Sequence, residues 1–224
     1  MIVLNNKCNL EKDEFINYLK SLETINHELI LCPSTINIPE FNSNKILLGA
    51  QNVSKAEDGP HTGEVSAKQL SSYGVKYCIV GHSERRLEEK ETNKDINKKI
   101  KRLQKENITP ILCVGETKEE RRKKVYKRVI NQELREALVN IENVENIIIA
   151  YEPIYSIGTG IIPKINEIEE IIELIKKKLP NNKVLYGGSV SLNNKDELSK
   201  INSIDGYLIG GLGLHVEDLN KFLN

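Results

Sequence analysis

Residues 147–160 read IIIAYEPIYSIGTG, a continuous apolar run that ends in a tyrosine, a glutamate and a proline and is followed by two glycines. A run with no polar alternation is typical of a strand buried on both faces, as in a parallel sheet. Glu152 and the glycines after it then fall where the strand gives way to a loop. The same unit recurs along the chain, so this stretch indicates how the whole chain folds.

Eight such apolar runs are spaced over the chain, with helical patterns between most of them. The runs cover residues 2–4, 29–31, 46–48, 77–80, 111–114, 147–150, 184–186 and 207–209. Among the helical patterns, isoleucines recur at helical period from Ile168 to Ile175, and Thr92 with Asp95 resembles a capping box. Eight strands alternating with helices predict an α/β fold, a compact single-domain (β/α)8 or TIM barrel over residues 1–224. A doubly wound open sheet is the alternative that the pattern leaves open.

One connection is shorter than the others. Between the second and third predicted strands only residues 34–45 remain for a helix, and they include Pro39, which disrupts the interior of a helix. A crossover between parallel strands usually needs a dozen residues or more, so this segment stands at the lower limit, with a proline in its middle. We therefore predict a shortened connection between strands 2 and 3 in place of a full helix.

The composition limits the partners of this chain. Its 224 residues are 39% hydrophobic, and its 32 Lys and Arg balance its 32 Asp and Glu, which argues against nucleic acid or an anionic membrane as a partner. The basic stretch from Arg121 to Lys124 is better explained as a solvated helix face. With no signal-peptide pattern and no apolar run of membrane-spanning length, we expect a cytoplasmic protein. The four cysteines and four histidines show no metal-ligand spacing, so we expect free thiols, no metal and no cofactor.

Residues with catalytic potential follow several of the predicted strands. Lys7, His82 and Glu152 lie at such ends, as do glycine pairs at 187–188 and 210–211. Singly, such residues have ordinary explanations: a lysine after a strand is usually solvated, a lone histidine is usually a hydrogen-bonded structural residue, and a glycine pair usually turns the chain. Because the carboxyl ends of barrel strands share one face, together they supply a base, an electrophile, a positive charge and a backbone cradle for phosphate.

Several stretches also resemble the signatures of the triosephosphate isomerase family. They are YCIVGHSERR at 77–86, IIAYEPIYSIGTG at 148–160, LYGGSV at 185–190, DGYLIGG at 205–211, Asn5-x-Lys7, and Ala50-Gln51-Asn52 followed by His61-Thr62-Gly63-Glu64. The resemblance runs from residue 2 to the C-terminus in the expected order. It implies an aldose–ketose isomerase that interconverts dihydroxyacetone phosphate and D-glyceraldehyde 3-phosphate in glycolysis and gluconeogenesis.

The resemblance also implies the catalytic roles. Glu152 is implied to move a proton between adjacent carbons through an enediolate, and His82 to hydrogen-bond the substrate oxygens. A helix N-terminus is implied to keep His82 neutral, for which this family is itself a standard example. Lys7 is implied as a positive charge near the substrate and Glu84 as a supporting carboxylate. The implied substrate-binding residues are Asn5, Lys7, Gly158, Ser189, Gly210 and Gly211.

A lid and a dimer interface are implied in the same way. The lid and latch residues are Pro153, Tyr155, Ile157, Thr159, Gly160, Tyr186 and Ser83. Tyr186 is implied to latch the closed lid and Ser83 to hold Glu152 before closure. The loop over residues 51–64 is implied to reach into a partner subunit, with Thr62 near the partner's active site, so we expect a homodimer.

The chain departs from the family's usual pattern at several positions. Asn6 replaces an aromatic residue, Cys8 an apolar residue near the expected dimer contact, and Tyr155 a tryptophan in the lid hinge. Residues 161–163 and Leu212-Gly213 also differ from the usual residues. None of these changes removes a catalytic group, but they bear on lid closure and on interface packing.

Two other functions remain alternatives at the level of sequence. A different phosphate-handling barrel, such as an epimerase or an indole-forming synthase, needs a metal cluster or another acid–base set. A catalytically inactive barrel kept as a scaffold has no need of Lys7, His82 and Glu152 together. An assay for the interconversion of the two triose phosphates separates all three.

Overall fold

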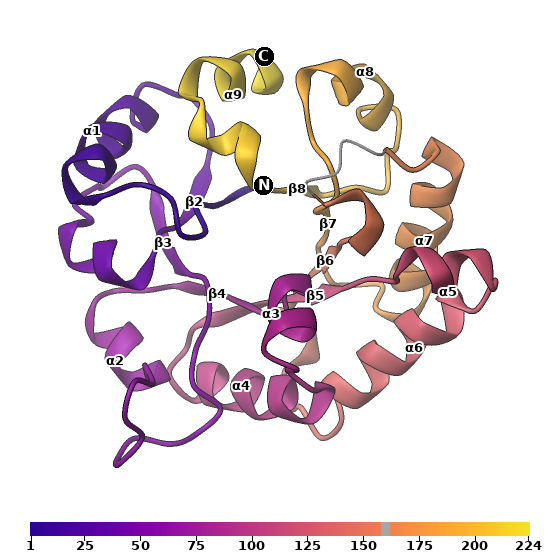
Figure 1. Cartoon of the computed structure of the whole chain (residues 1–224), viewed down its shortest axis with the longest axis horizontal. Coiled ribbons are helices and arrows are strands. Elements are labelled where there is room, and N and C mark those ends of the chain that lie inside the picture. Colours follow the sequence, from indigo (N-terminus) through magenta and orange to yellow (C-terminus); the bar gives the residue numbers. More distant parts are fainter. Residues whose placement is uncertain (158–161) are drawn as a thin grey trace.

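The computed structural model describes residues 1–157 and 162–224, and within them eight parallel strands close into a barrel (Figure 1). The strands are β1 Ile2–Asn5, β2 Leu29–Cys32, β3 Leu47–Ala50, β4 Tyr77–Val80, β5 Thr109–Val114, β6 Ile148–Tyr151, β7 Val184–Tyr186 and β8 Gly206–Ile209. They pair in sequence order, and β8 returns to β1 with Tyr207 opposite Ile2. The closed order confirms the predicted barrel and contradicts the open sheet, which has unpaired edges.

Helices surround the strands as an outer ring (Figure 1). The α-helices are α1 Lys12–Leu22, α2 Ala67–Ser72, α3 Ser83–Glu88, α4 Asn93–Lys105, α5 Lys118–Arg122, α6 Tyr126–Ala137, α7 Ile165–Lys178, α8 Lys195–Leu198 and α9 Val216–Leu223. Short 3-10 turns are η1 Thr35–Glu40, η2 Val144–Asn146, η3 Ile154–Ser156, η4 Leu192–Asn194 and η5 Gly211–Leu214. The predicted capping box is present at the start of α4, where Thr92 and Asp95 bond each other's backbone amides.

The core has an inner and an outer layer because successive strand residues point to opposite faces. Val3 and Ile30 face the barrel interior with apolar side chains from the other strands. Leu4 and Leu31 face outward and pack against α1 residues such as Phe15. This two-sided burial explains why the strands appear in the sequence as continuous apolar runs.

The connection between β2 and β3 is short, as predicted. The 3-10 turn η1 takes the place of a crossover helix, and Pro39 lies within it. Ile38 points inward and is buried, whereas Ile36 is 79% exposed. A short 3-10 helix therefore covers this part of the barrel.

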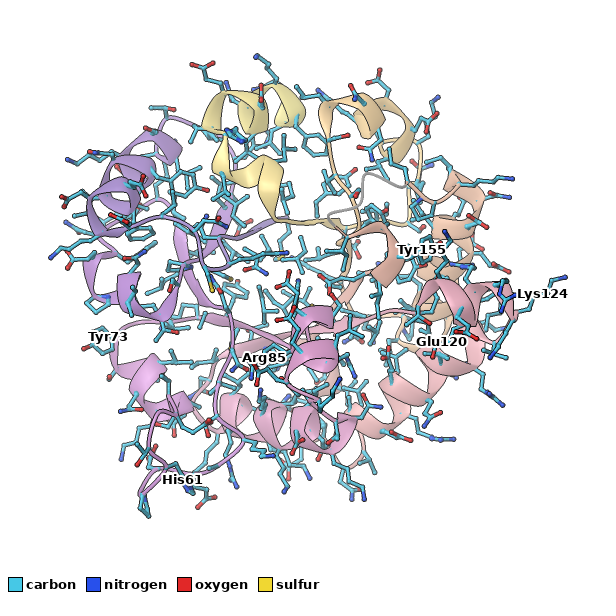
Figure 2. The ribbon with its side chains drawn as sticks, viewed as in Figure 1. His61, Tyr73, Arg85, Glu120, Lys124 and Tyr155 are labelled. Atoms are coloured by element: carbon cyan, nitrogen blue, oxygen red, sulfur yellow. The ribbon has the colours of Figure 1, made fainter. Side chains whose placement is uncertain are left out.

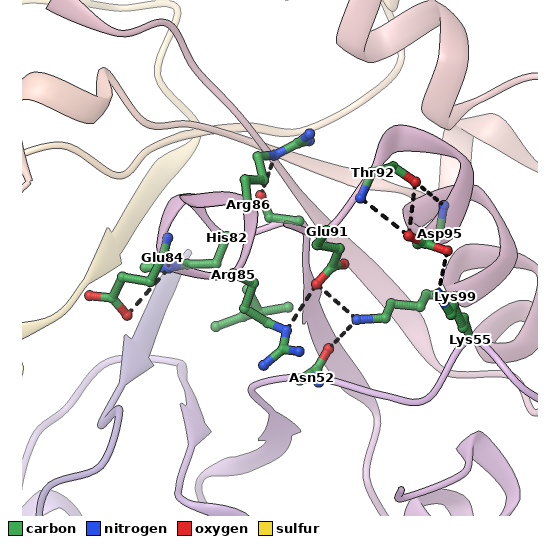
Figure 3. Close-up of polar contacts among 12 residues, drawn as sticks. Asn52, Lys55, His82, Glu84, Arg85, Arg86, Glu91, Thr92, Asp95 and Lys99 are labelled. Carbon is green, nitrogen blue, oxygen red and sulfur yellow. Dashed lines mark hydrogen bonds and ion pairs between the residues drawn. The ribbon is translucent and has the colours of Figure 1, made fainter. Parts of the chain in front are cut away.

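The segment between β3 and α2 projects beyond the outer ring, and His61 lies near its tip (Figures 1 and 2). Its base is anchored by buried charges (Figure 3): Glu91 accepts hydrogen bonds from Arg85 and Lys99, both at 2.9 Å, and Lys99 Nζ donates to Asn52 Oδ1 at 2.6 Å. Burial lowers the pKa of Lys99, and the Glu91 carboxylate opposes that change. The loop thus leaves the barrel from a fixed base.

Candidate active site

A pocket of about 270 Å³ opens at the carboxyl ends of the strands. This size suits a small phosphorylated metabolite, since sites for drug-sized ligands are usually larger. The predicted residues that line it are Asn5, Lys7, His82, Glu152, Ile157, Ser189, Gly210 and Gly211. The fold therefore brings together residues from five strands that are far apart in the sequence.

Glu152 follows β6 and is 2% exposed. Its amide donates to Val114 O at 2.8 Å, and a Cβ on Gly115 would lie 1.8 Å from the Glu152 carbonyl oxygen. Its Oε1 lies 3.4 Å from His82 Nε2, and its Oε2 has no hydrogen-bond partner among the described residues. Such an unpaired buried oxygen is uncommon. Glu152 also lines the pocket, so its carboxylate is placed beside a bound ligand.

His82 is the N-cap residue that precedes α3, and its two ring nitrogens have different surroundings. Nδ1 accepts the Glu84 backbone N–H at 3.3 Å. A nitrogen that accepts a hydrogen bond carries no proton, so the proton of the imidazole lies on Nε2, which faces Glu152. Glu84 Oε2 lies farther from Nδ1, at 3.6 Å, beyond hydrogen-bond distance. His82 is therefore placed as a neutral hydrogen-bond donor to the pocket.

Lys7 has a φ of 52°, a left-handed conformation that is uncommon for a residue with a side chain. Two side chains support it: Lys7 N donates to Asn5 Oδ1 at 3.1 Å, and Gln51 Nε2 donates to Lys7 O at 2.9 Å. Gln51 Nε2 also lies 3.0 Å from Cys32 O. This strained backbone directs the lysine side chain across the pocket, where its Cε lies 3.6 Å from where a Cβ on Gly210 would stand.

Glu84 lies between the lysine and the histidine. Its Oε1 accepts from Lys7 Nζ at 2.5 Å, and its side chain is 43% exposed (Figure 3 shows it beside His82). Ser83 is predicted to hold Glu152 before the lid closes. Among the described residues no hydrogen bond joins Ser83 to Glu152, whose carboxylate faces His82 instead.

The opposite wall of the pocket consists of backbone turns after β7 and β8. Ser189 donates its hydroxyl proton to the Ser156 carbonyl. Gly210 precedes η5 and Gly211 begins it, and a Cβ on Gly211 would meet no atom within 4 Å. The backbone of this turn therefore borders open space, as a phosphate cradle requires. Gly158, the other predicted phosphate-binding glycine, lies outside the described residues.

The structure describes only some of the residues predicted for the lid and latch. Pro153 precedes η3, Ile157 lines the pocket, and Thr159 and Gly160 lie outside the described residues. Burial raises the pKa of Tyr155, and the nearby Arg121 opposes that rise. Tyr186 is fully buried at the end of β7, and burial raises its pKa as well.

A buried carboxylate lies beneath the lid hinge, where sequence reasoning assigned no function. Glu116 is fully buried, and its Oε1 accepts from Arg121 at 2.6 Å and from the Tyr151 hydroxyl at 3.1 Å. The Glu116 carbonyl also accepts the Ile154 amide at 3.0 Å. The guanidinium of Arg121 stacks 4.0 Å above the Tyr126 ring. Burial raises the pKa of Glu116, whereas the charge of Arg121 lowers it.

A second charged pair missed by sequence reasoning, the largely buried Arg86 and Glu133, lies behind Glu152 and His82. Arg86 donates to Gly81 O at 2.7 Å and to Cys113 O at 3.0 Å, and it lies 3.5 Å from Glu133. Glu133 Oε2 accepts the Gly115 amide at 2.9 Å. Burial raises the pKa of Glu133 to about 7. The rule that strand ends bear functional residues, applied to β5 as well, would have pointed to Gly115.

Other predicted features lie away from the pocket. Thr62 belongs to the projecting loop and is absent from the described lining of the pocket. All four cysteines are free, and only Cys8 among them is exposed. No cluster of His, Cys, Asp and Glu in residues 1–157 and 162–224 could hold a metal ion. Within the same described ranges, no helix is long and apolar enough to cross a membrane.

Comparison with known proteins gives a match along the whole chain. The profile of the family described as triosephosphate isomerase covers residues 1–224. The chain belongs to the triosephosphate isomerase family. Among relatives called triosephosphate isomerase, that of Trichodesmium erythraeum is 42% identical over 229 residues, covering 97% of this chain and 94% of the relative. One from a Nostoc strain is 41% identical (97% and 94% covered), and that of Mesomycoplasma hyorhinis is 38% identical (97% and 93% covered).

Membership of the triosephosphate isomerase family assigns an activity to the chain. That activity is the interconversion of dihydroxyacetone phosphate and D-glyceraldehyde 3-phosphate in glycolysis, an aldose–ketose isomerisation. The family resemblance, the barrel and the activity predicted from the sequence are thereby confirmed. The epimerase and synthase alternatives are excluded by the family match.

Proposed function

We propose that Glu152 and His82 isomerise the triose phosphate as a base and a neutral hydrogen-bond donor. Glu152 takes a proton from the carbon next to the carbonyl, and the electron pair left behind forms a C=C bond as the carbonyl oxygen becomes an enediolate oxygen. His82 Nε2–H stabilises that oxygen while a hydroxyl proton shifts between the two substrate oxygens. The Glu152 carboxyl then returns its proton to the neighbouring carbon, which moves the carbonyl by one position.

One observation carries this proposal. Glu152 Oε1 and His82 Nε2 lie 3.4 Å apart in one pocket wall, with Glu152 Oε2 unpaired among the described residues and His82 Nδ1 occupied by a backbone amide. A base and a donor that face the same small space can act on adjacent atoms of one substrate. The roles themselves follow the family.

We infer that Lys7 supplies positive charge to the substrate. Its ammonium group pairs with Glu84 here, and the half-exposed Glu84 carboxylate can give way to a more strongly charged phosphate dianion. Asn5 supports the strained Lys7 backbone and is placed to make a polar contact beside it. The role of Ser83 as a resting partner of Glu152 stays a prediction.

We further infer how the phosphate is bound and covered. Backbone N–H groups hold the phosphate, with the Ser189 hydroxyl, at Gly158, Ser189, Gly210 and Gly211. Residues 153–163 form the lid, in which Pro153, Tyr155, Ile157, Thr159 and Gly160 take part and Tyr186 acts as the latch. Closure matters because a solvated enediolate phosphate readily loses its phosphate group.

We propose that the reaction needs no cofactor or metal and takes place in the cytoplasm. Moving a proton between carbons next to a carbonyl requires a base and a hydrogen-bond donor, and this chain supplies both. The proposed location follows from the glycolytic role of the family's substrates.

Exchange of Glu152 for Asp tests the assignment of the base. The shorter side chain retracts the carboxylate by about one methylene, so kcat is expected to fall by about 100-fold or more. The measurement is a coupled assay of triose phosphate interconversion. Glu28→Asp makes the same chemical change at an exposed position before β2, at the other end of the barrel, and should keep the parent activity. A Glu152→Asp variant as active as the parent would show that another group is the base.

We also propose a homodimer in which the loop over residues 51–64 completes the partner's site. Three observations support it: the loop projects beyond its own barrel, its base is fixed by buried charges, and Thr62 is absent from the described lining of its own pocket. Cys8 neighbours Lys7 and is exposed in the isolated chain. An exposed thiol is open to a labelling reagent, whereas Cys32, Cys78 and Cys113 are buried.

Exhaustive thiol labelling under conditions that loosen the dimer tests this arrangement. Cys8 is expected to react before the three buried cysteines, and a bulky label there should separate the subunits and abolish activity. Mass and activity are read from native elution volume and the coupled assay. A Cys8→Ser variant serves as the control and should resist both changes. Dimer mass and activity that persist after complete labelling would contradict the proposal.

A further inference from the structure

We propose that Tyr18 is a positioning residue for the substrate's phosphate, acting through the backbone of η5. The inference rests on the proposed function, because it explains what fixes the turn that binds the phosphate. Tyr18 belongs to α1 and is absent from the described lining of the pocket, so its effect on the substrate must pass through other residues.

The contact is a single hydrogen bond between segments far apart in the chain. The Tyr18 hydroxyl donates to Gly213 O at 2.6 Å, and both residues are buried. The Tyr18 ring packs in the apolar layer between α1 and the barrel, which fixes the direction of its hydroxyl. Burial raises the pKa of Tyr18 to about 12, with Asn6 opposing that rise, so the hydroxyl keeps the proton that it donates.

A second hydrogen bond connects Gly213 to the phosphate side of the turn. Gly213 N–H donates to Gly210 O at 2.9 Å, so both backbone polar groups of Gly213 are engaged. Gly210 and Gly211 border the pocket where the phosphate is proposed to bind. Two hydrogen bonds therefore connect Tyr18, through Gly213, to Gly210 in the turn where the phosphate is proposed to bind.

Packing restricts the turn from the opposite side. A Cβ on Gly213 would lie 3.1 Å from Leu4 Cδ2, which is tighter than an ordinary van der Waals contact. The turn therefore rests directly on β1 and has little freedom to approach it. Without the Tyr18 hydroxyl, the buried Gly213 carbonyl would lack this partner and would favour conformations in which the turn opens towards solvent.

This arrangement predicts an effect confined to phosphate recognition. Tyr18 acts on the turn after β8, whereas Glu152 and His82 follow β6 and β4 and have their own supports. In Tyr18→Phe, we expect kcat/KM for D-glyceraldehyde 3-phosphate to fall about tenfold. The inhibition constant of inorganic phosphate should rise by about the same factor. A change of this size is expected for the loss of one buried hydrogen bond. The rate with D-glyceraldehyde, which lacks the phosphate, should stay within about twofold of the parent.

The control and a second variant keep the test decisive. Ser21→Ala removes a hydroxyl from the same helix that bonds to Asn17 O within α1, and it should leave all three quantities unchanged. If Tyr18→Phe does not fold, Gly213→Ala displaces the same turn against Leu4 and should show the same phosphate-selective loss. Equal losses with phosphorylated and unphosphorylated substrate, or no loss with either, would overturn the proposal. A parent protein with no isomerase activity would instead overturn the proposed function.

Discussion

The two walls of the pocket are fixed by different kinds of interaction. Behind Glu152 and His82, the buried charged side chains of Arg86 and Glu133 bind the backbone at the ends of β4 and β5. On the phosphate side, the contacts are hydroxyl-to-carbonyl hydrogen bonds, such as that from Tyr18 to Gly213. One wall is built with charge-assisted bonds and the other with neutral ones, which are about half as strong.

The difference matches the role proposed for each wall. Proton transfer depends steeply on the distance between the base and the carbon, so the catalytic wall needs side chains that do not move. A phosphate group is large and bears two charges, so several backbone amides can bind it while the turn adjusts to a closing lid. We therefore expect substitutions in the catalytic wall to lower kcat and those in the phosphate wall to raise KM.

The largest effect is expected from Gly115→Ala. An added Cβ would lie 1.8 Å from the Glu152 carbonyl oxygen, so the end of β6 must move. We expect the free energy of unfolding to fall by about 2–4 kcal/mol and kcat by about 100-fold or more. Thermal unfolding and the coupled assay measure the two changes.

Gly211→Ala is the matched substitution in the other wall. A Cβ there would meet no atom within 4 Å, so the free energy of unfolding should change by less than about 0.5 kcal/mol, with any loss of activity expressed in KM. If both variants lowered kcat alike, the distinction between a rigid catalytic wall and an adjustable phosphate wall would be wrong.

The fold could be predicted from the sequence because each strand is buried on both faces. Runs such as residues 147–150 then lack any polar interruption, and eight of them alternating with helical patterns favour the barrel over an open sheet. The candidate site followed from one topological rule, since polar residues after parallel strands meet at one face. Lys7, His82 and Glu152 were found in this way, and the pocket contains all three.

The supports of the site could not be predicted in the same way. Glu133 lies in a helix rich in charged residues, where nothing in the local sequence distinguishes a buried carboxylate from a solvated one. Tyr18 reaches Gly213 across 195 positions of the sequence, and the left-handed backbone of Lys7 depends on Gln51 from the segment after β3. These contacts arise from tertiary packing, which the period of a sequence pattern does not record.

A smaller effect than that of Gly115→Ala concerns the ionisation of Glu133 in the catalytic wall. Burial raises its pKa from 4.5 to about 7, Arg86 lowers it, and the charges of Glu120 and Glu116 add to the rise. Between these two values the folded state binds more protons than the unfolded state, so the contribution of Glu133 to stability falls as pH rises. The contribution is complete below about pH 4.5 and is lost as the pH passes through about 7.

Glu133→Gln removes this titration while keeping an oxygen that can accept the Gly115 amide. Between about pH 5 and pH 8, we expect the parent to lose of the order of 2 kcal/mol of unfolding free energy relative to the variant. Denaturant unfolding at several pH values measures the difference between the two slopes. Exposed Glu145→Gln is the control and should reproduce the parent slope. Equal slopes for parent and Glu133→Gln would mean that Glu133 is already ionised in the folded protein, and that a permanent ion pair with Arg86 holds the catalytic wall at every pH tested.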